Sequence, residues 1–214
     1  MEPFIILSSI AVVVAVILFS FYREHKRTEA LKTLATNWGF DYVGAGNQRI
    51  LSNASDFDLF HKGRSRRIKN LMRGHQAGAQ VEVFDYSFRT GSGKNSQTHM
   101  QTVVLITSEK LSLPYFMLLP ENFLHSIGNF FGYRDIDFQD YPNFSKRYLL
   151  RGDDETQIRQ VFDYRVIPWY EARQNVSTEG SGHCLMYYYA KRRYAPKNWR
   201  SLASEAVEAY QHFV

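Results

Sequence analysis

The N-terminal segment contains the feature that most constrains the fold. Residues 3–22, PFIILSSIAVVVAVILFSFY, carry no charged side chain, and a basic segment follows them. At about 1.5 Å per helical residue, this stretch reaches roughly 30 Å, the thickness of the hydrocarbon core of a bilayer. A cleaved signal peptide would need a positive start and a shorter apolar core, whereas only Met1 and Glu2 precede this run. The pattern therefore predicts an uncleaved transmembrane helix.

The charges beside this helix predict its orientation. No Lys or Arg precedes it, and several follow within a short distance, so we expect the N-terminus outside and the rest of the chain in the cytoplasm. Aromatic rings and basic side chains favour the interface between membrane and water. The predicted interface residues are Phe19, Phe21, Tyr22, Arg23, Lys26 and Arg27.

The remaining sequence is that of one ordinary folded domain. Its apolar and aromatic residues, 44% and 15% of the whole chain, suffice for a substantial core. The single cysteine, Cys184, excludes an intramolecular disulfide and fits a reducing compartment. We therefore divide the chain into an anchor with its basic flank, residues 1–27, and a cytoplasmic domain, residues 28–214. A split into two subdomains near residues 111–114 is the alternative, but no linker composition marks one.

Periodicity predicts an α+β fold, with a mainly antiparallel sheet of six to eight strands packed with amphipathic helices. Apparent hairpins, rather than alternating strands and helices, favour the antiparallel arrangement. Residues 80–90 and 99–108 form the clearest pair, and apolar residues on both faces place it centrally in the sheet. The other expected strands are 40–43, 57–61, 114–119, 148–150, 169–176 and 183–190, and the expected helices are 28–38, 121–131, one from about 153, and 196–213.

Residues 61–80 contain six basic side chains and no acidic one. As a functional surface they would contact anionic lipid, a phosphate-bearing ligand or an acidic protein face. As a plain structural feature they would be a solvated loop with a short turn at residues 68–72. The candidate contact residues are Lys62, Arg64, Arg66, Arg67, Lys69 and Arg73.

Other chemical motifs are incomplete. GSGKNSQ, residues 91–97, lacks the Ser or Thr and the following helix of a phosphate-binding loop, so we interpret it as a hairpin loop. Asp135, Asp137 and Asp140 lack the glycine and glutamate of a calcium loop. The cluster of tyrosines and bases at residues 187–200 has no nucleic-acid-binding module around it. We expect no catalytic residues, metal site or cofactor, and nucleic acid is not an expected partner.

Several short motifs resemble one group of proteins. They are NLMRG (70–74), FDY (84–86), LPE (119–121), GYRDID (132–137) and FSKRYLLRGD (144–153). Together they resemble a group of bacterial proteins of unknown activity that have one N-terminal transmembrane helix and a cytoplasmic α+β domain. The resemblance implies a bacterial source and an inner-membrane location. It implies no functional residues.

Three hypotheses for function follow. The leading one is a non-enzymatic accessory or scaffold subunit of a larger bacterial inner-membrane complex, such as a bioenergetic one, with other membrane-protein subunits and anionic lipid headgroups as partners. Its motives are the absence of a catalytic motif and an anchor rich in small residues, Ser8, Ser9, Ala11 and Ala15. The second is a membrane-tethered module that binds an anionic ligand or lipid through residues 62–73. The third is an enzyme whose site is assembled from distant residues.

Overall fold

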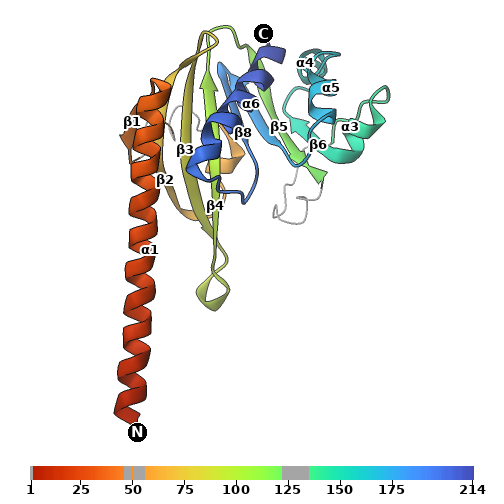
Figure 1. Cartoon of the computed structure of the whole chain (residues 1–214). Helices are drawn as coiled ribbons and strands as arrows, with labels where there is room; N and C mark the ends of the chain where they lie inside the picture. The colour runs from red at the N-terminus through yellow and green to blue at the C-terminus, as the bar shows by residue number, and fades with distance from the viewer. Residues whose placement is uncertain (1, 46–49, 51–55, 122–134) are drawn as a thin grey trace.

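A computed structural model describes residues 2–45, 50, 56–121 and 135–214, with side chains from Ile10 onward. It opens with one uninterrupted helix, α1 (Glu2–Trp38), of 37 residues. At the usual rise per residue this helix is about 55 Å long. Its N-terminal half projects beyond the rest of the molecule, and its C-terminal part lies beside the sheet (Figure 1). The predicted anchor and the predicted helix over residues 28–38 are therefore parts of a single rod.

The C-terminal part of α1 is amphipathic, as predicted. Leu31 and Ala35 are buried in the core, and Leu34 and Trp38 pack against it. The helix ends at Gly39, whose φ of +71° is readily adopted by glycine and turns the chain out of the helix. Immediately afterwards β1 (Asp41–Gly44) pairs with the edge of the sheet, which fixes this end of α1.

Eight strands form one sheet in the order β1-β2-β3-β4-β8-β7-β5-β6. All the pairings between them are antiparallel, so the predicted fold class of sheet and helices is confirmed. The central pair β3–β4 is buried on both faces, as its two-sided apolar pattern predicts. Beyond β1, the strands are β2 (Arg64–Gln76), β3 (Ala79–Thr90), β4 (Gln97–Thr107), β5 (Leu113–Pro120), β6 (Tyr148–Gly152), β7 (Ser177–Gly182) and β8 (Cys184–Tyr188).

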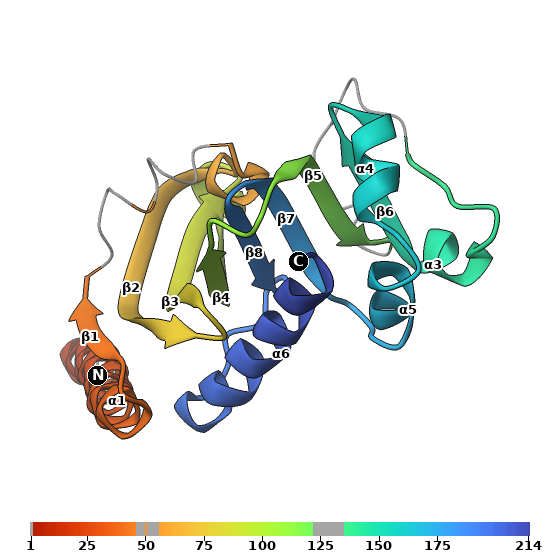
Figure 2. The same ribbon diagram turned by 90° about the horizontal axis from the view of Figure 1, so that it is seen from above.

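The helices cover one face of this sheet. α6 (Trp199–His212) lies across its middle, and α3 (Pro142–Arg147), α4 (Glu155–Val161) and α5 (Val166–Glu171) gather near β6 (Figure 2). The largest core cluster fills the space between them. On the other face, a second cluster lies beneath the short 3-10 helix η1 (Asp58–Phe60). The described residues also form the 3-10 turns η2 (Gly93–Asn95), between β3 and β4, and η4 (Pro196–Asn198), which leads into α6.

Most of the element predictions are confirmed. β1, β3, β4, β5 and β6 form where expected, Asp154 caps α4 by accepting a hydrogen bond from the amide of Gln157, and Pro196 precedes the last helix. Four predictions are wrong. Residues 57–61 form η1 instead of a strand, and residues 61–80 are mostly the strand β2 instead of a loop. Residues 169–176 form the end of α5 and irregular backbone instead of a strand, and residues 177–182, expected as the loop after that strand, are the strand β7. Trp169 accordingly lies in α5. The helix expected over residues 121–131 falls almost wholly outside the described residues.

In the part of the chain that the structure describes, no helix combines the length and the apolarity that crossing a membrane requires. The predicted anchor, residues 3–22, lies within α1, but the side chains of residues 3–9 are not among those described.

Candidate functional site

A buried carboxylate on the central sheet holds α1 in place. Asp85 lies on β3, and its side chain is only 8% exposed. Arg27 on α1 donates to both carboxylate oxygens, from Nε to Oδ2 and from Nη2 to Oδ1, at 2.8 Å each. This bidentate geometry is the strongest pairing that an arginine and a carboxylate make. Because the two residues lie on different elements, the pair fixes the helix against the sheet.

A second arginine extends the pair into a chain of charges. Arg193, which follows β8, donates to Oδ2 of Asp85 from Nε at 3.1 Å and from Nη2 at 3.0 Å. The same guanidinium donates to Glu24 on α1, from Nη1 at 2.5 Å and from Nη2 at 2.8 Å. We call Arg27, Asp85, Arg193 and Glu24 the Asp85 cluster. It carries two positive and two negative charges and therefore has no formal net charge.

Polar side chains complete the coordination of Asp85. The Asn70 amide donates to Oδ2 at 3.0 Å, and the Thr102 hydroxyl donates to Oδ1 at 3.2 Å. Asn70 has a φ of +55°, and the register of β2 against β3 shifts beside it. Its carbonyl oxygen also accepts from the hydroxyls of Thr28 and Tyr42. The bulge thus turns one side chain of β2 into a bridge between the sheet, α1 and β1.

The electrostatics keep the cluster charged. Burial is the largest influence on Asp85 and raises its pKa, but the hydrogen bonds and charges of Arg27 and Arg193 together outweigh burial and leave the pKa below its usual range. The hydrogen bonds from Arg193 lower the pKa of Glu24. For Arg193, burial lowers the pKa, while Glu24 and Asp85 raise it by more. Asp85, Glu24 and Arg193 are therefore ionised at neutral pH.

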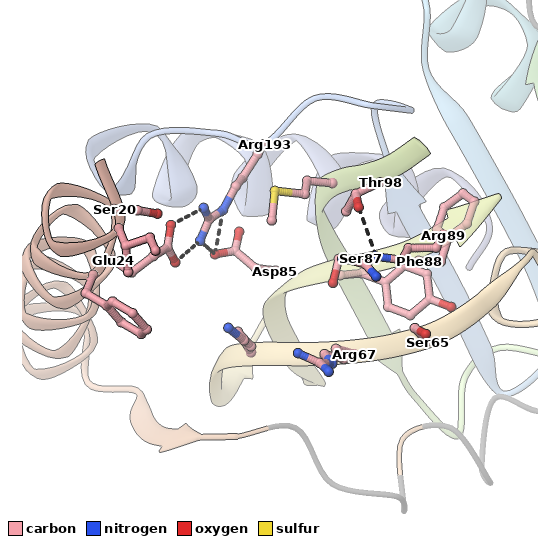
Figure 3. Close-up of a pocket in the computed structure, with 15 residues that line it drawn as sticks. Ser20, Glu24, Ser65, Arg67, Asp85, Ser87, Phe88, Arg89, Thr98 and Arg193 are labelled. Atoms are coloured by element: carbon pink, nitrogen blue, oxygen red, sulfur yellow. Dashed lines mark hydrogen bonds and ion pairs between the residues drawn. The ribbon is translucent and has the colours of Figure 1, made fainter. Parts of the chain in front are cut away.

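A cavity of about 450 Å³ opens beside the Asp85 cluster, between α1 and the strands β2, β3 and β4. One face of α1 lines it at i, i+3, i+4, i+7 spacing. Figure 3 shows Glu24 and Asp85 joined through Arg193 on one side of the cavity, and Arg67 on β2. Its described lining residues are Ile17, Ser20, Phe21, Glu24, Ser65, Arg67, Lys69, Asp85, Tyr86, Ser87, Phe88, Arg89, Thr98, Met100 and Arg193. We call it the α1–sheet cavity.

The structure separates the six predicted contact residues into two kinds. Lys62 pairs with Asp58 at 3.2 Å, and Arg73 pairs with Glu82. Arg64 and Arg66 donate to the backbone carbonyls of Gly91 and Phe60. Only Arg67 and Lys69 line the α1–sheet cavity. These two are exposed, and in the described part of the chain neither has a carboxylate within ion-pair distance.

The predicted interface residues also divide. Phe19, Phe21 and Tyr22 are exposed, and the cations of Arg23 and Lys26 lie over the rings of Phe19 and Tyr22, at 5.9 Å and 5.0 Å from the ring centroids. Arg27, in contrast, points into the domain, where its side chain is only 12% exposed against Asp85. Its role in the structure is to hold the helix on the sheet.

Sequence reasoning missed three cavity residues that matter here. Arg89 lines the cavity from β3, and its Nε donates to the Thr98 hydroxyl at 3.2 Å. In the sequence, Asp85 and Arg193 stand only within other patterns, the FDY motif and the cluster of tyrosines and bases. One signal was available: an aspartate in the middle of a strand that is apolar on both faces requires cations nearby, because an unpaired buried carboxylate is costly.

Two other features that the sequence raised have local structural roles. Asp135 accepts a hydrogen bond from the amide of Leu150 at 3.0 Å, which ties residue 135 to β6. Tyr187 and Tyr188 are buried in the two core clusters on opposite faces of the sheet. Among the described residues, no group of three or more His, Cys, Asp or Glu side chains is arranged to hold a metal ion.

Comparisons with known proteins bear on the fold. No protein-family model matches the chain, and no curated protein matches it significantly. Among solved structures, the chain is similar to the crystal structure of the mycobacterial trehalose monomycolate transport factor A, TtfA, with a TM-score of 0.61 and 11% sequence identity. The match covers 87% of this chain and 93% of that one. At this identity, the similarity shows the fold and no more.

Proposed function

We propose that this chain is a non-enzymatic, membrane-anchored accessory subunit of a bacterial inner-membrane assembly, with its N-terminus outside and its α+β domain in the cytoplasm. The observation that carries the proposal is the construction of α1. One uninterrupted helix joins an apolar segment to the domain, without a linker. The Asp85 cluster then fixes the angle between helix and domain. A chain built in this way holds its domain in a fixed orientation relative to the membrane that contains the apolar segment.

The exposed side chains support this proposal. From Ile10 to Tyr22, apolar side chains are exposed around the whole helix, and Phe21 is 71% exposed. Outside α1, the described large apolar side chains that are exposed are Val43, Met100, Tyr164 and Val214, and they come from separate elements. An apolar surface of this kind needs lipid or another protein to cover it. We therefore place the main contact with partner subunits on α1.

The structural neighbour suggests the kind of assembly. Its name describes a transport factor, and the shared fold makes a transport complex the first candidate by analogy. A bioenergetic complex remains the other kind of inner-membrane assembly that we consider. In either case the helix would pack laterally on other membrane helices, where small residues allow close approach.

The proposal predicts that the chain co-purifies with partners through the small-residue face of α1. We expect gentle solubilisation of native membranes, followed by capture on a C-terminal tag, to recover one large complex with a fixed subunit ratio. Enlarging two small residues, Ala11→Leu with Ala15→Leu, should abolish this recovery while the chain stays in the membrane fraction. The measurement is mass spectrometry of the captured proteins, with quantitation of each subunit.

A second pair of substitutions tests whether the effect depends on the face of the helix. Val12→Leu with Val16→Leu has the same helical spacing and enlarges neighbouring exposed positions, so it should leave the complex intact. Recovery of the wild-type chain as a monomer or homo-oligomer would contradict the proposal. A chain that leaves the membrane under carbonate extraction would contradict the anchor itself.

A further inference from the structure

The α1–sheet cavity lies at the end of the apolar stretch of α1. Ile17, Ser20 and Phe21 belong to that stretch, which ends at Tyr22, whereas Glu24 lies just beyond it. If α1 is anchored as proposed above, the cavity spans the boundary between the hydrocarbon and the headgroups. Figure 1 shows the β3–β4 hairpin pointing in the same direction as the N-terminal half of α1, so this end of the sheet also faces that boundary.

The open wall of the cavity is positively charged. Arg67 and Lys69 lie on the same side of β2, and Arg89 lies on the adjacent strand, β3. The three side chains have no carboxylate partner among the described residues. The two carboxylates at the cavity, those of Asp85 and Glu24, are already paired with arginines. An anion that enters the cavity therefore meets cations whose charge no carboxylate offsets.

The remaining lining fits a lipid better than a free anion. Hydroxyls from Ser20, Ser65, Ser87 and Thr98 can donate hydrogen bonds to phosphate or glycerol oxygens. The side chains of Ile17, Phe21 and Met100 add an apolar path on the α1 side, and Met100 is 45% exposed. A volume of about 450 Å³ lies in the range of small-molecule sites. A free phosphate would use the cations and leave the apolar wall uncovered.

We propose that the α1–sheet cavity binds the phosphate-bearing headgroup of an anionic membrane lipid, whose acyl chains run along the apolar face of α1. Arg67, Lys69 and Arg89 contact the phosphate. This lipid-binding site would be a property of the chain in addition to its proposed role as an accessory subunit. The inference rests on one part of that proposed function, the anchoring of α1 in the membrane. Bound lipid would occupy the space between helix and sheet beside the Asp85 cluster.

The test measures binding of short-chain lipids to the full chain in a neutral detergent. The probes are dihexanoyl phosphatidylglycerol, dihexanoyl phosphatidylcholine and inorganic phosphate, and the readout is isothermal titration calorimetry. We expect phosphatidylglycerol to bind at least about tenfold more tightly than either other probe, since charge-assisted contacts and the apolar path act together only on it. This comparison needs no variant, so it does not depend on a substitution being tolerated.

Variants then locate the site. The triple variant Arg67→Gln, Lys69→Gln, Arg89→Gln should weaken binding of phosphatidylglycerol by about tenfold or more. A matched triple variant removes the same charge from exposed lysines that do not line the cavity and should bind within about twofold of wild type. Its substitutions are Lys110→Gln, Lys146→Gln and Lys197→Gln. Circular dichroism and thermal unfolding establish that both variants are folded. If the triple variant of the cavity is not folded, Arg67→Gln or Arg89→Gln alone replaces it.

Each contrary result contradicts one part of the lipid-binding proposal. If phosphatidylcholine binds as tightly as phosphatidylglycerol, the site does not recognise negative charge. If inorganic phosphate binds as tightly as phosphatidylglycerol, the ligand is not a lipid. Unchanged binding in the cavity variant moves the site elsewhere. The accessory role is tested separately by capture from native membranes, so the lipid site can fail while the complex is recovered, and the reverse.

Discussion

Replacing Asp85 with alanine is expected to lower the free energy of unfolding by about 3–5 kcal/mol, the range found when one member of a buried ion pair is removed. The substitution leaves Arg27 and Arg193 close together without the carboxylate that both contact. Burial and mutual repulsion of the two guanidinium groups then oppose folding. Urea unfolding of the full chain in detergent, followed by tryptophan fluorescence, measures the loss. Trp199 is a suitable reporter because Arg27 lies over its ring, at 5.6 Å from the centroid.

Two further variants separate charge from packing. Asp85→Asn keeps the size of the side chain and one acceptor oxygen but removes the charge. It should therefore recover only a small part of the stability that Asp85→Ala loses. Glu29→Ala breaks an exposed ion pair with Lys32 on the same helix and should leave the unfolding transition almost unchanged. If Asp85→Ala unfolds at the same urea concentration as Glu29→Ala, the Asp85 cluster does not hold α1 on the sheet.

Stability is expected to fall as the pH rises from about 4.5 to about 7, by about 3 kcal/mol from one residue. Glu179 on β7 is fully buried. Burial, the dominant effect, raises the pKa of Glu179 to about 7 from its ordinary value of 4.5. Nearby, Lys62 lowers this pKa and Asp58 raises it, while hydrogen bonds from Tyr188 and from the amide of Leu59 lower it.

The sign follows from where the proton is held. Between these two pH values the unfolded chain loses the proton of Glu179, whereas the folded chain keeps it, so a higher pH favours unfolding. Below about 4.5 both states hold the proton, and above about 7 both have lost it, so this contribution is constant outside the window. Urea unfolding at several pH values from 4 to 8 measures the slope.

Glu179→Gln should remove this slope. Glutamine keeps an acceptor for the Leu59 amide and the Tyr188 hydroxyl but does not titrate in this range. Glu155→Gln, an exposed glutamate on α4, is the matched control and should leave the slope as in wild type. The assignment is wrong if the Glu179→Gln variant still loses stability between pH 4.5 and 7 to the same extent as the control.

The fold was predictable where the hydrophobic pattern decides the structure. The alternation in β3 and β4 and the helical spacing of Leu31, Leu34, Ala35 and Trp38 both report burial directly, and both were confirmed. β7 was missed because its sequence, STEGSG, reads as a turn. It is a strand because β5 and β8 pair with it on both sides, and tertiary pairing overrides weak local preference.

β2 and the site show a second limit. Basic residues interrupt the apolar alternation of β2, and the bulges near Ser65 and Asn70 shift its register, so the pattern of a strand is lost. The sequence correctly identified residues 61–80 as a cationic segment. It could not distinguish Arg67 and Lys69, which line the cavity, from Arg73, whose carboxylate partner lies on the neighbouring strand. That distinction depends on which residues the sheet brings together.

The Asp85 cluster also sets the order in which the molecule is completed. Arg193 and Glu24 are separated by 169 residues, and β3, with Asp85, lies between them in sequence. A chain made from its N-terminus exposes α1 early, while Arg193, the second arginine of the cluster, emerges among the last residues. During synthesis α1 can therefore enter a membrane or contact a partner before the Asp85 cluster is complete. The contacts that hold the domain in its orientation begin with Arg27 and Asp85 and are completed last, by Arg193.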